Sequence, residues 1–391
     1  MRSRGSTLAA FALLSGSYFA HIGFFNPYLP LWLKEQGLGL FAISLLSSTQ
    51  SATRLFAPYA WGWLSDHTGE RVKLLRFSAT VATVFSLGLW IDGGEVWIGT
   101  VLLLMFTHTS SMMSMSEAAM AHLVSGQGAF DARRYGRVRL WGSLGFLVTV
   151  LLAGAWFDHF GMRHFPAWTL ATLVVVTWAV WRLPDLKEQE APHAEGATSQ
   201  RPGVLPVLRR PEVRWFFAAV FFHVLSHISI YVFFSLYLDA LGYGKGAIGA
   251  LWAVSVVLEI AWFFTQGRWL PRLSLPGWLV LCAAATVLRM GLTAGAAGWL
   301  AALVVAQVLH ALTFAAHHAV CIALITEHFP GRLRGRGQAL YTVVGYGFTG
   351  VIGGLLGGAL SARLGLGAVY WAAVLSALAG LACAWKVWRR R

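Results

Sequence analysis

Twelve long apolar runs occupy most of this 391-residue chain and limit what it can fold into. A run of about 20 apolar residues crosses the hydrocarbon core of a bilayer as a helix, because a helix satisfies its own backbone hydrogen bonds. The approximate limits of the runs are 7 to 33, 41 to 64, 74 to 92, 96 to 124, 137 to 157, 165 to 183, 213 to 239, 247 to 266, 274 to 293, 299 to 327, 336 to 361 and 364 to 388. The sequence therefore predicts an all-α membrane protein with twelve transmembrane helices.

The composition excludes a soluble enzyme. Only 12% of the residues are charged and 57% are hydrophobic, whereas a soluble domain carries about a quarter charged residues. No nucleophile with a nearby base and no metal-ligand cluster stands out in the sequence. The three cysteines all fall inside apolar runs, which gives neither a zinc spacing nor a disulfide framework. We expect a protein that is not an enzyme and uses no metal or cofactor.

The chain divides into two six-helix halves that repeat each other. Residues 184–212 are polar and read as a cytoplasmic linker between an N-terminal bundle, 1–183, and a C-terminal bundle, 213–391. At an offset of 205 residues, the segment from Leu31 to Leu46 aligns without gaps with the segment from Leu236 to Leu251. Halves with an even number of crossings are parallel repeats, so we expect two pseudo-symmetric bundles with a midplane site between them.

The basic residues predict the orientation in the membrane. The chain has a formal net charge of +14, and 24 of its 30 Lys and Arg residues fall at the termini and in the loops of one face. The loops of the other face carry 4 Lys and Arg residues. Basic loops stay in the cytoplasm, so we expect both termini to be cytoplasmic and the first run to be a permanent span without a cleavable signal peptide. The positive charge therefore needs no nucleic acid as a partner.

The loop after the second run carries a recognisable signature. It reads GWLSDHTGERVKLL and contains Gly62, Leu64, Asp66, Gly69, Arg71 and Lys73. These positions resemble the GxLxDxxGxR/KxR/K signature of the major facilitator superfamily. The resemblance implies the major facilitator fold, a gating role for this loop and transport by alternating access.

Further segments resemble the phenylpropionate permease group, which is related to lactose permease and other proton symporters. They are YGRVRLWGSLGF from Tyr135, VVLEIAWFF around Glu259, LRMG around Arg289 and QVLHALTFAAHH from Gln307. The resemblance implies a monomer in a bacterial-type inner membrane that imports an aromatic carboxylate with protons. Neighbouring families move sugars or nucleosides.

Ionisable residues inside apolar runs are costly, so they usually face a cavity or a partner. Arg54, Glu117, Glu259 and Arg289 are such residues. Arg54 meets Glu259 at the repeat offset, which makes the two candidate charge partners. By resemblance to lactose permease, Glu117 and Arg139 bind substrate, and a guanidinium suits a carboxylate through two parallel hydrogen bonds. The alternative for Glu117 and Arg139 is a structural salt bridge.

Glu259, Arg289 and two histidines make a candidate proton-coupling set. Burial disfavours a charged carboxylate and a nearby arginine favours it, so moving Arg289 relative to Glu259 would take up or release a proton. His310 and His317 are seven residues apart, within about 20° of one face of a regular helix. Either histidine could instead be packed against a neighbouring carbonyl.

Two aromatic-rich runs supply the remaining substrate candidates. His21 lies in the first run and Tyr231 in the seventh, and both helices line the cavity of the fold that the resemblance implies. Lipid-facing positions or packing in the protein core are the alternatives, because aromatic residues at such density usually serve one of these two roles. His223 and His227 share a helix at the spacing of a metal pair but have no acidic or cysteine partner, so we expect no metal there.

The leading hypothesis is a proton-coupled symporter that imports a small organic anion, such as a phenylpropionate. A proton-coupled sugar or nucleoside symporter is the alternative. A drug/proton antiporter is a third, which the first helix disfavours because it has no acidic residue before Glu35. Protons, the substrate and the lipid bilayer are the only partners expected.

Overall fold

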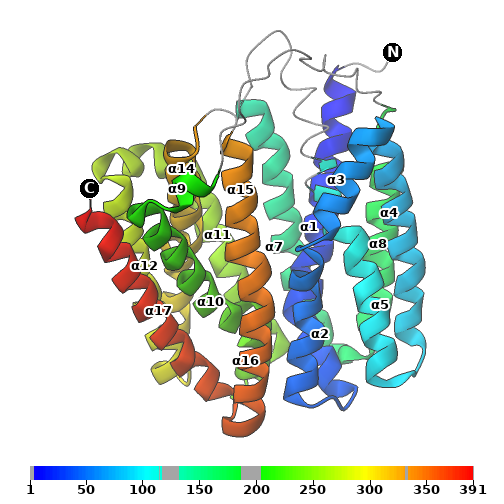
Figure 1. Ribbon diagram of the computed structural model, residues 1–391. Coiled ribbons are helices and arrows are strands. Elements are labelled where there is room, and N and C mark those ends of the chain that lie inside the picture. The colour runs from blue at the N-terminus through cyan, green and yellow to red at the C-terminus, as the bar shows by residue number, and fades with distance from the viewer. Residues whose placement is uncertain (1–3, 114, 117–131, 186–203, 331–332, 391) are drawn as a thin grey trace. The chain divides into compact units, whose positions relative to one another are not determined.

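The computed structural model describes residues 4–113, 115–116, 132–185, 204–330 and 333–390, with the side chains of these residues except 4–6, 66 and 132–139. The described residues form helices joined by short turns, with no strand among them (Figure 1). Contacts divide the chain into two units, Met1–Leu38 with Thr49–Ala197 and Gly39–Ser48 with Thr198–Arg391. The predicted domain limits at 183 and 213 stay a prediction.

The N-terminal half contributes the helices α1 to α8. They are α1 (Arg4–Glu35), α2 (Leu40–Thr53), α3 (Ala57–Thr68), α4 (Arg71–Ser86), α5 (Gly94–Thr109), α7 (Ala132–Phe160) and α8 (Phe165–Trp181), with the 3-10 turns η1 (Leu87–Trp90) and η3 (Met162–His164). Helix α1 packs against α7 and α8, and α4 packs against α5 and α8.

The second predicted span is not one continuous helix. Helix α2 ends at Thr53, and α3 begins at Ala57, with Pro58 in its first turn. Proline has no N–H to donate to the carbonyl four residues back, which belongs to Arg54. The prediction of an unbroken span from 41 to 64 is therefore wrong, and Arg54 lies in the turn between the two helices.

The turn after α1 recurs after the first long helix of the C-terminal half, at the predicted offset. Gly37 and Gly242 both have positive φ angles, +79° and +87°. The N–H of Leu38 donates to the carbonyl of Leu33 at 3.3 Å, and the N–H of Tyr243 donates to that of Leu238 at 3.0 Å. Glycine adopts this left-handed conformation without strain, which explains why both copies of the turn have a glycine at this position. The predicted internal repeat is confirmed at this turn.

Glycines bring α1 and α7 into close contact. A Cβ atom at Gly145 would overlap the carbonyl oxygen of Gly16, and one at Gly23 would lie 2.7 Å from backbone atoms of Phe146. The hydroxyl of Thr149 donates to the carbonyl of Ala20 at 2.7 Å across the same contact. Small residues allow such close approach of membrane helices.

The C-terminal half contributes the remaining helices. They are α9 (Leu205–Leu208), α10 (Pro211–Ala240), α11 (Lys245–Trp269), α12 (Leu275–Ala296), α13 (Leu300–Val308), α14 (His317–His328), α15 (Arg334–Thr342), α16 (Thr349–Leu364) and α17 (Leu366–Arg389), with the 3-10 turn η4 (Leu270–Arg272). Two π-helical segments interrupt longer spans, namely η5 (Ala311–Ala316) between α13 and α14 and η7 (Val343–Phe348) between α15 and α16.

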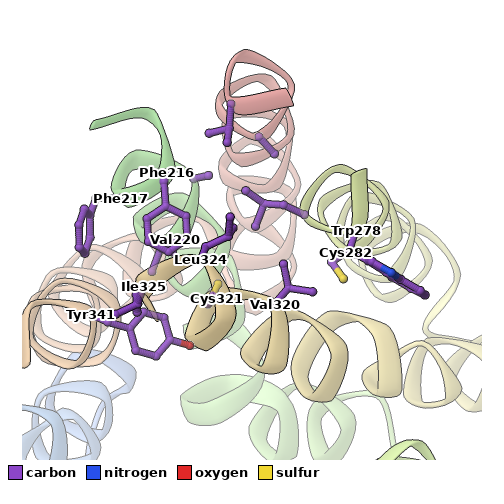
Figure 2. Close-up of a cluster of buried hydrophobic side chains, with 14 of the residues drawn as sticks. Phe216, Phe217, Val220, Trp278, Cys282, Val320, Cys321, Leu324, Ile325 and Tyr341 are labelled. Atoms are coloured by element: carbon purple, nitrogen blue, oxygen red, sulfur yellow. The ribbon is translucent and has the colours of Figure 1, made fainter. Parts of the chain in front are cut away.

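An apolar core holds one end of these helices together. Figure 2 shows Phe216 and Val220 of α10 in the same cluster as Cys282 of α12 and Leu324 of α14. All four side chains are buried. The cysteines are thus small core residues, and Cys282, Cys321 and Cys383 are all buried and free.

The glycines of α16 allow a close contact with α2. A Cβ atom at Gly354 or Gly358 would lie within 3.0 Å of Ser48 or Ser44, which belong to the same unit. The hydroxyl of Ser44 also donates to the carbonyl of Gly354 at 2.6 Å. Glycine at these two positions therefore lets the two helices approach closely.

Ten helices of the described residues are long and apolar enough to cross a membrane. The predicted second span is missing from this set because it is split into α2 and α3. The predicted fourth span runs into residues outside the described ranges. The fold is an all-α membrane protein, and the described helices are consistent with twelve crossings.

Candidate functional site

Six polar side chains of neighbouring spans form a cluster in the second unit, which we call the Arg289 cluster. Its members are Ser255 and Glu259 on α11, Arg289 on α12, Gln307 at the end of α13, His310 just before η5, and Thr313 in η5. Helices α11 and α12 both contact α13 and η5. The cluster therefore contains three of the four residues predicted to couple protons.

Arg289 is buried among neutral acceptors. Its side chain is 1% exposed. Nη1 donates to Nδ1 of His310 at 3.0 Å and to Oγ1 of Thr313 at 2.9 Å, and Nη2 donates to Oε1 of Gln307 at 3.0 Å. None of the carboxylates that the structure describes forms an ion pair with Arg289. The guanidinium is thus held in place by hydrogen bonds but has no direct counter-ion there.

His310 links Arg289 to Glu259. A guanidinium only donates, so Nδ1 of His310 must carry the lone pair and Nε2 must carry the hydrogen. Nε2 lies 3.5 Å from Oε2 of Glu259. The Glu259 side chain is 20% exposed and that of His310 is 9% exposed. The carboxylate and the guanidinium therefore communicate through one neutral imidazole ring.

Gln307 has a fixed amide orientation. Its Oε1 accepts from Nη2 of Arg289 and, at 2.5 Å, from the hydroxyl of Ser255. Ser255 lies one turn before Glu259 on α11, so the two residues are on the same face of that helix. Gln307 thereby ties α11 to α12.

The π-helical segment η5 explains a contact between this cluster and α10. The N–H of His317 donates to the carbonyl of Leu312, five residues back, as a π-helix requires. The carbonyl of Thr313, which a regular α-helix would use there, accepts instead from Nε2 of His223 at 2.8 Å. Single π turns often occur at functional sites.

His317 takes part in a separate stack of histidines. Its ring lies parallel to that of His223, with ring centroids 3.5 Å apart, and the ring of His227 stacks on that of His223 at 4.6 Å. His317 also lies 3.6 Å from the thiol sulfur of Cys321. The single face predicted for His310 and His317 is wrong, because η5 changes the spacing of a regular helix. A coupling role for His317 stays a prediction.

The predicted substrate residues of the two aromatic helices lie in different surroundings. His21 is buried, shares a hydrogen bond of 2.9 Å with Thr172 and packs against Phe24 and Phe25. This is the core packing that the sequence left as an alternative. Tyr231 is half-buried on α10, with its ring 6.3 Å from that of His227.

The other predicted charges are not brought to the Arg289 cluster by any described contact. Glu117 lies outside the described residues, and so does the side chain of Arg139, whose backbone lies in α7. Arg54 is half-buried and belongs to the first unit, whereas Glu259 belongs to the second. The substrate roles of Glu117 and Arg139 and the pairing of Arg54 with Glu259 stay predictions.

The signature loop joins α3 to α4. Gly69 ends α3 with φ +66°, and Nε of Arg71 donates back to the hydroxyl of Ser65 at 2.9 Å. Lys73 pairs with Glu70 at 2.6 Å on the surface. No described atom lies within 4 Å of a Cβ built on Gly62. The side chain of Asp66 is not among those that the structure describes. The gating role of the loop stays a prediction.

Three members of the cluster were missed by reasoning from the sequence. Ser255, Gln307 and Thr313 are uncharged, so they do not stand out in an apolar run as Arg289 does. Helical spacing could have identified two of them, because Ser255 is four residues before Glu259 and Gln307 three residues before His310.

Known proteins resemble this chain over nearly its whole length. Residues 10–372 match the MFS_1-like family. A probable 3-phenylpropionic acid transporter of Escherichia coli (strain K12) is 29% identical over 93% of both chains. A maltose permease of Geobacillus stearothermophilus is 26% identical over 90% of this chain and 87% of its own.

Solved structures support the same fold. A mutant of the nucleoside transporter NupG superposes with a TM-score of 0.81, at 15% identity, covering 98% of this chain and 99% of that one. The family match spans well over half of the chain, and the apolar helices are those of a multi-pass membrane protein. The chain therefore belongs to the MFS_1-like family and is a secondary transporter of the major facilitator superfamily.

Proposed function

We propose that the chain is a proton-coupled symporter that imports a small organic anion, with an aromatic carboxylate as its substrate. The observation that carries the proposal is Arg289, which is 1% exposed, bonded to neutral acceptors and linked to Glu259 through His310. Alternating access moves the anion and the proton across the membrane together.

The need of Arg289 for a counter-ion favours an anionic substrate. A buried cation is strongly disfavoured unless a charge or a full set of hydrogen bonds compensates it. Its three described acceptors are uncharged as hydrogen-bonded here. A substrate carboxylate would supply the missing negative charge and could engage the planar guanidinium through two hydrogen bonds.

Charge balance then accounts for the coupling. Arg289 and Glu259 together carry no net charge when both are ionised. An incoming carboxylate makes the cluster negative in a medium of low dielectric constant, and one proton restores neutrality. Anion and proton therefore favour the binding of each other, which is the linkage that a symporter requires. Glu259 accepts this proton, because Nδ1 of His310 is occupied by Arg289.

The relatives and the local side chains support an aromatic substrate. One relative is named as a probable 3-phenylpropionic acid transporter. Next to the cluster, Phe314 stacks on His310 with ring centroids 5.0 Å apart and an angle of 7°. Aromatic side chains in this position can pack against a phenyl ring.

A proton-coupled sugar or nucleoside symporter is the second candidate. The relative named maltose permease, 26% identical over 90% of this chain, favours it. Gln307, Ser255 and Thr313 could serve a neutral polyol as hydrogen-bonding groups. This candidate leaves the charge of Arg289 without a substrate counter-ion, and we place it second for that reason.

Uptake into proteoliposomes distinguishes the candidates. Vesicles with an alkaline interior are given labelled 3-phenylpropionate, maltose or uridine in an acidic medium, with and without a protonophore. We expect 3-phenylpropionate alone to accumulate, and we expect the protonophore to abolish the accumulation. Gradient-driven uptake of maltose or uridine instead would establish the second candidate.

Passive permeation needs its own control. The neutral form of a small aromatic acid crosses bilayers and also distributes with a pH gradient. Protein-free vesicles and vesicles with the Arg289→Met variant therefore set the background. Accumulation by the wild type that does not exceed this background would contradict the proposal.

A further inference from the structure

We infer that the amide nitrogen of Gln307 and Nε of Arg289 form a subsite that binds the carboxylate of the substrate. The inference rests on the proposed function and adds the atoms that recognise the anion in the second unit. Gln307 thereby becomes a substrate-binding residue, alongside its structural contact with Arg289.

Both nitrogens are buried donors without partners. Gln307 and Arg289 are each 1% exposed. Nε2 of Gln307 and Nε of Arg289 have no hydrogen-bond acceptor among the described residues. Buried N–H groups are almost always satisfied, because a donor that is removed from water without an acceptor is destabilising. Two such donors on side chains that touch each other indicate an acceptor that is not among the residues that the structure describes.

The amide of Gln307 cannot satisfy itself by turning over. A flip would exchange Oε1 and Nε2 and place the NH2 group against Nη2 of Arg289, which is also a donor. It would also remove the acceptor of the Ser255 hydroxyl. The contact with Arg289, which can only donate, therefore fixes Oε1 on the side of Arg289 and Ser255, and Nε2 keeps its hydrogens for another partner.

The geometry of the arginine selects a carboxylate. Nε and Nη2 form one edge of the planar guanidinium, the edge that engages carboxylates in bidentate pairs. Nη2 is bonded to Oε1 of Gln307, so the amide extends this edge with its own N–H groups. Two oxygens of one carboxylate can accept from Nε of Arg289 and from Nε2 of Gln307. All of these groups are donors, which fits an acceptor-only anion better than a polyol that must also donate.

The test compares an anion with its neutral amide on purified protein. Binding of 3-phenylpropionate and of 3-phenylpropionamide is measured by calorimetry for the wild type, Gln307→Glu and Gln36→Glu. Gln307→Glu keeps an oxygen for Arg289 and Ser255 but replaces the free donor with an oxygen. Gln36 is exposed in the turn after α1. Gln36→Glu therefore makes the same charge change away from the site.

We expect Gln307→Glu to weaken the binding of 3-phenylpropionate by about tenfold or more. Binding of the amide should change much less, because its NH2 group can donate to the new carboxylate. Gln36→Glu should bind both compounds as the wild type does. Should Gln307→Glu not fold, Gln307→Met, which has nearly the same volume and no donor, is expected to lose 3-phenylpropionate binding in the same way.

The remaining outcomes separate the two proposals. Unchanged binding of 3-phenylpropionate by both Gln307 variants overturns the subsite alone and means that a water molecule satisfies Nε2. An equal loss for the acid and the amide also overturns it, since the carboxylate is then not what Gln307 recognises. A wild-type protein that binds neither compound overturns the proposed function, and the subsite falls with it.

Discussion

Nδ1 of His310 accepts a hydrogen bond from Nη1 of Arg289 at 3.0 Å. One lone pair therefore serves either the guanidinium or a proton, but not both. While the bond is made, a proton that enters the cluster has Glu259 as its acceptor, 3.5 Å beyond Nε2 of the same ring. The imidazole thus connects the carboxylate to Arg289 while remaining neutral.

Replacing His310 should reveal its role as an acceptor. His310→Leu leaves Nη1 of Arg289 with Thr313 as its remaining acceptor among the described residues, and we expect a loss of about 1–3 kcal/mol of stability. His310→Asn offers Oδ1 near the position of Nδ1 and should lose clearly less. Thermal unfolding of both variants in one detergent measures the difference. Equal melting temperatures would show that the bond from Arg289 to His310 contributes nothing.

Ser255 is expected to act as a positioning residue through Gln307. Removing its hydroxyl in Ser255→Ala leaves Oε1 of Gln307 with Arg289 alone. We expect KM for the transported acid to rise several-fold, within the ~0.5–1.5 kcal/mol of one neutral hydrogen bond, while kcat stays the same. Ser255→Thr should restore KM. A fall of kcat with no change of KM would contradict this role.

The contact between α1 and α7 makes Gly145 intolerant of a side chain. A Cβ there would overlap the backbone oxygen of Gly16, which cannot rotate away as a side chain can. We expect Gly145→Ala to cost roughly 1–3 kcal/mol or more, because overpacking forces the helices apart. Gly291→Ala is the control, since its Cβ meets nothing within 4 Å. Equal melting temperatures of the two variants would contradict the close contact.

Reporter fusions test the orientation that the basic residues predict. An enzyme that is active only outside the cytoplasm is fused after Arg391 or after Gly39, in the turn between α1 and α2. The split of 24 basic residues to 4 predicts an inactive fusion at the C-terminus and an active fusion after Gly39. The reverse pattern would place both termini outside.

Reasoning from the sequence predicted the fold and part of the site, for a physical reason. Ionisable groups are expensive in a bilayer, so Glu259, Arg289 and His310 were conspicuous, and the structure brings them together. Neutral polar residues such as Gln307 cost less and are common in helices, so nothing in the sequence separated them from packing residues.

The departures from regular helices were the least predictable features. Pro58 could have indicated the break between α2 and α3. It lies inside a long apolar run, however, and that run predicted a single span. The π-helical segment η5 has no periodic signature, and it redirects the carbonyl of Thr313 to His223. The side of the helix on which His317 lies could therefore not be predicted from residue spacing alone.

The Glu259→Gln variant tests the central claim most directly. The measurement is the ratio of gradient-driven accumulation to equilibrium exchange of labelled 3-phenylpropionate in proteoliposomes, after subtraction of protein-free vesicles. The uncharged amide that replaces the carboxylate in this variant cannot take up or release the proton, so we predict that exchange persists while accumulation falls to background. Accumulation at the wild-type level in this variant would contradict proton coupling through Glu259.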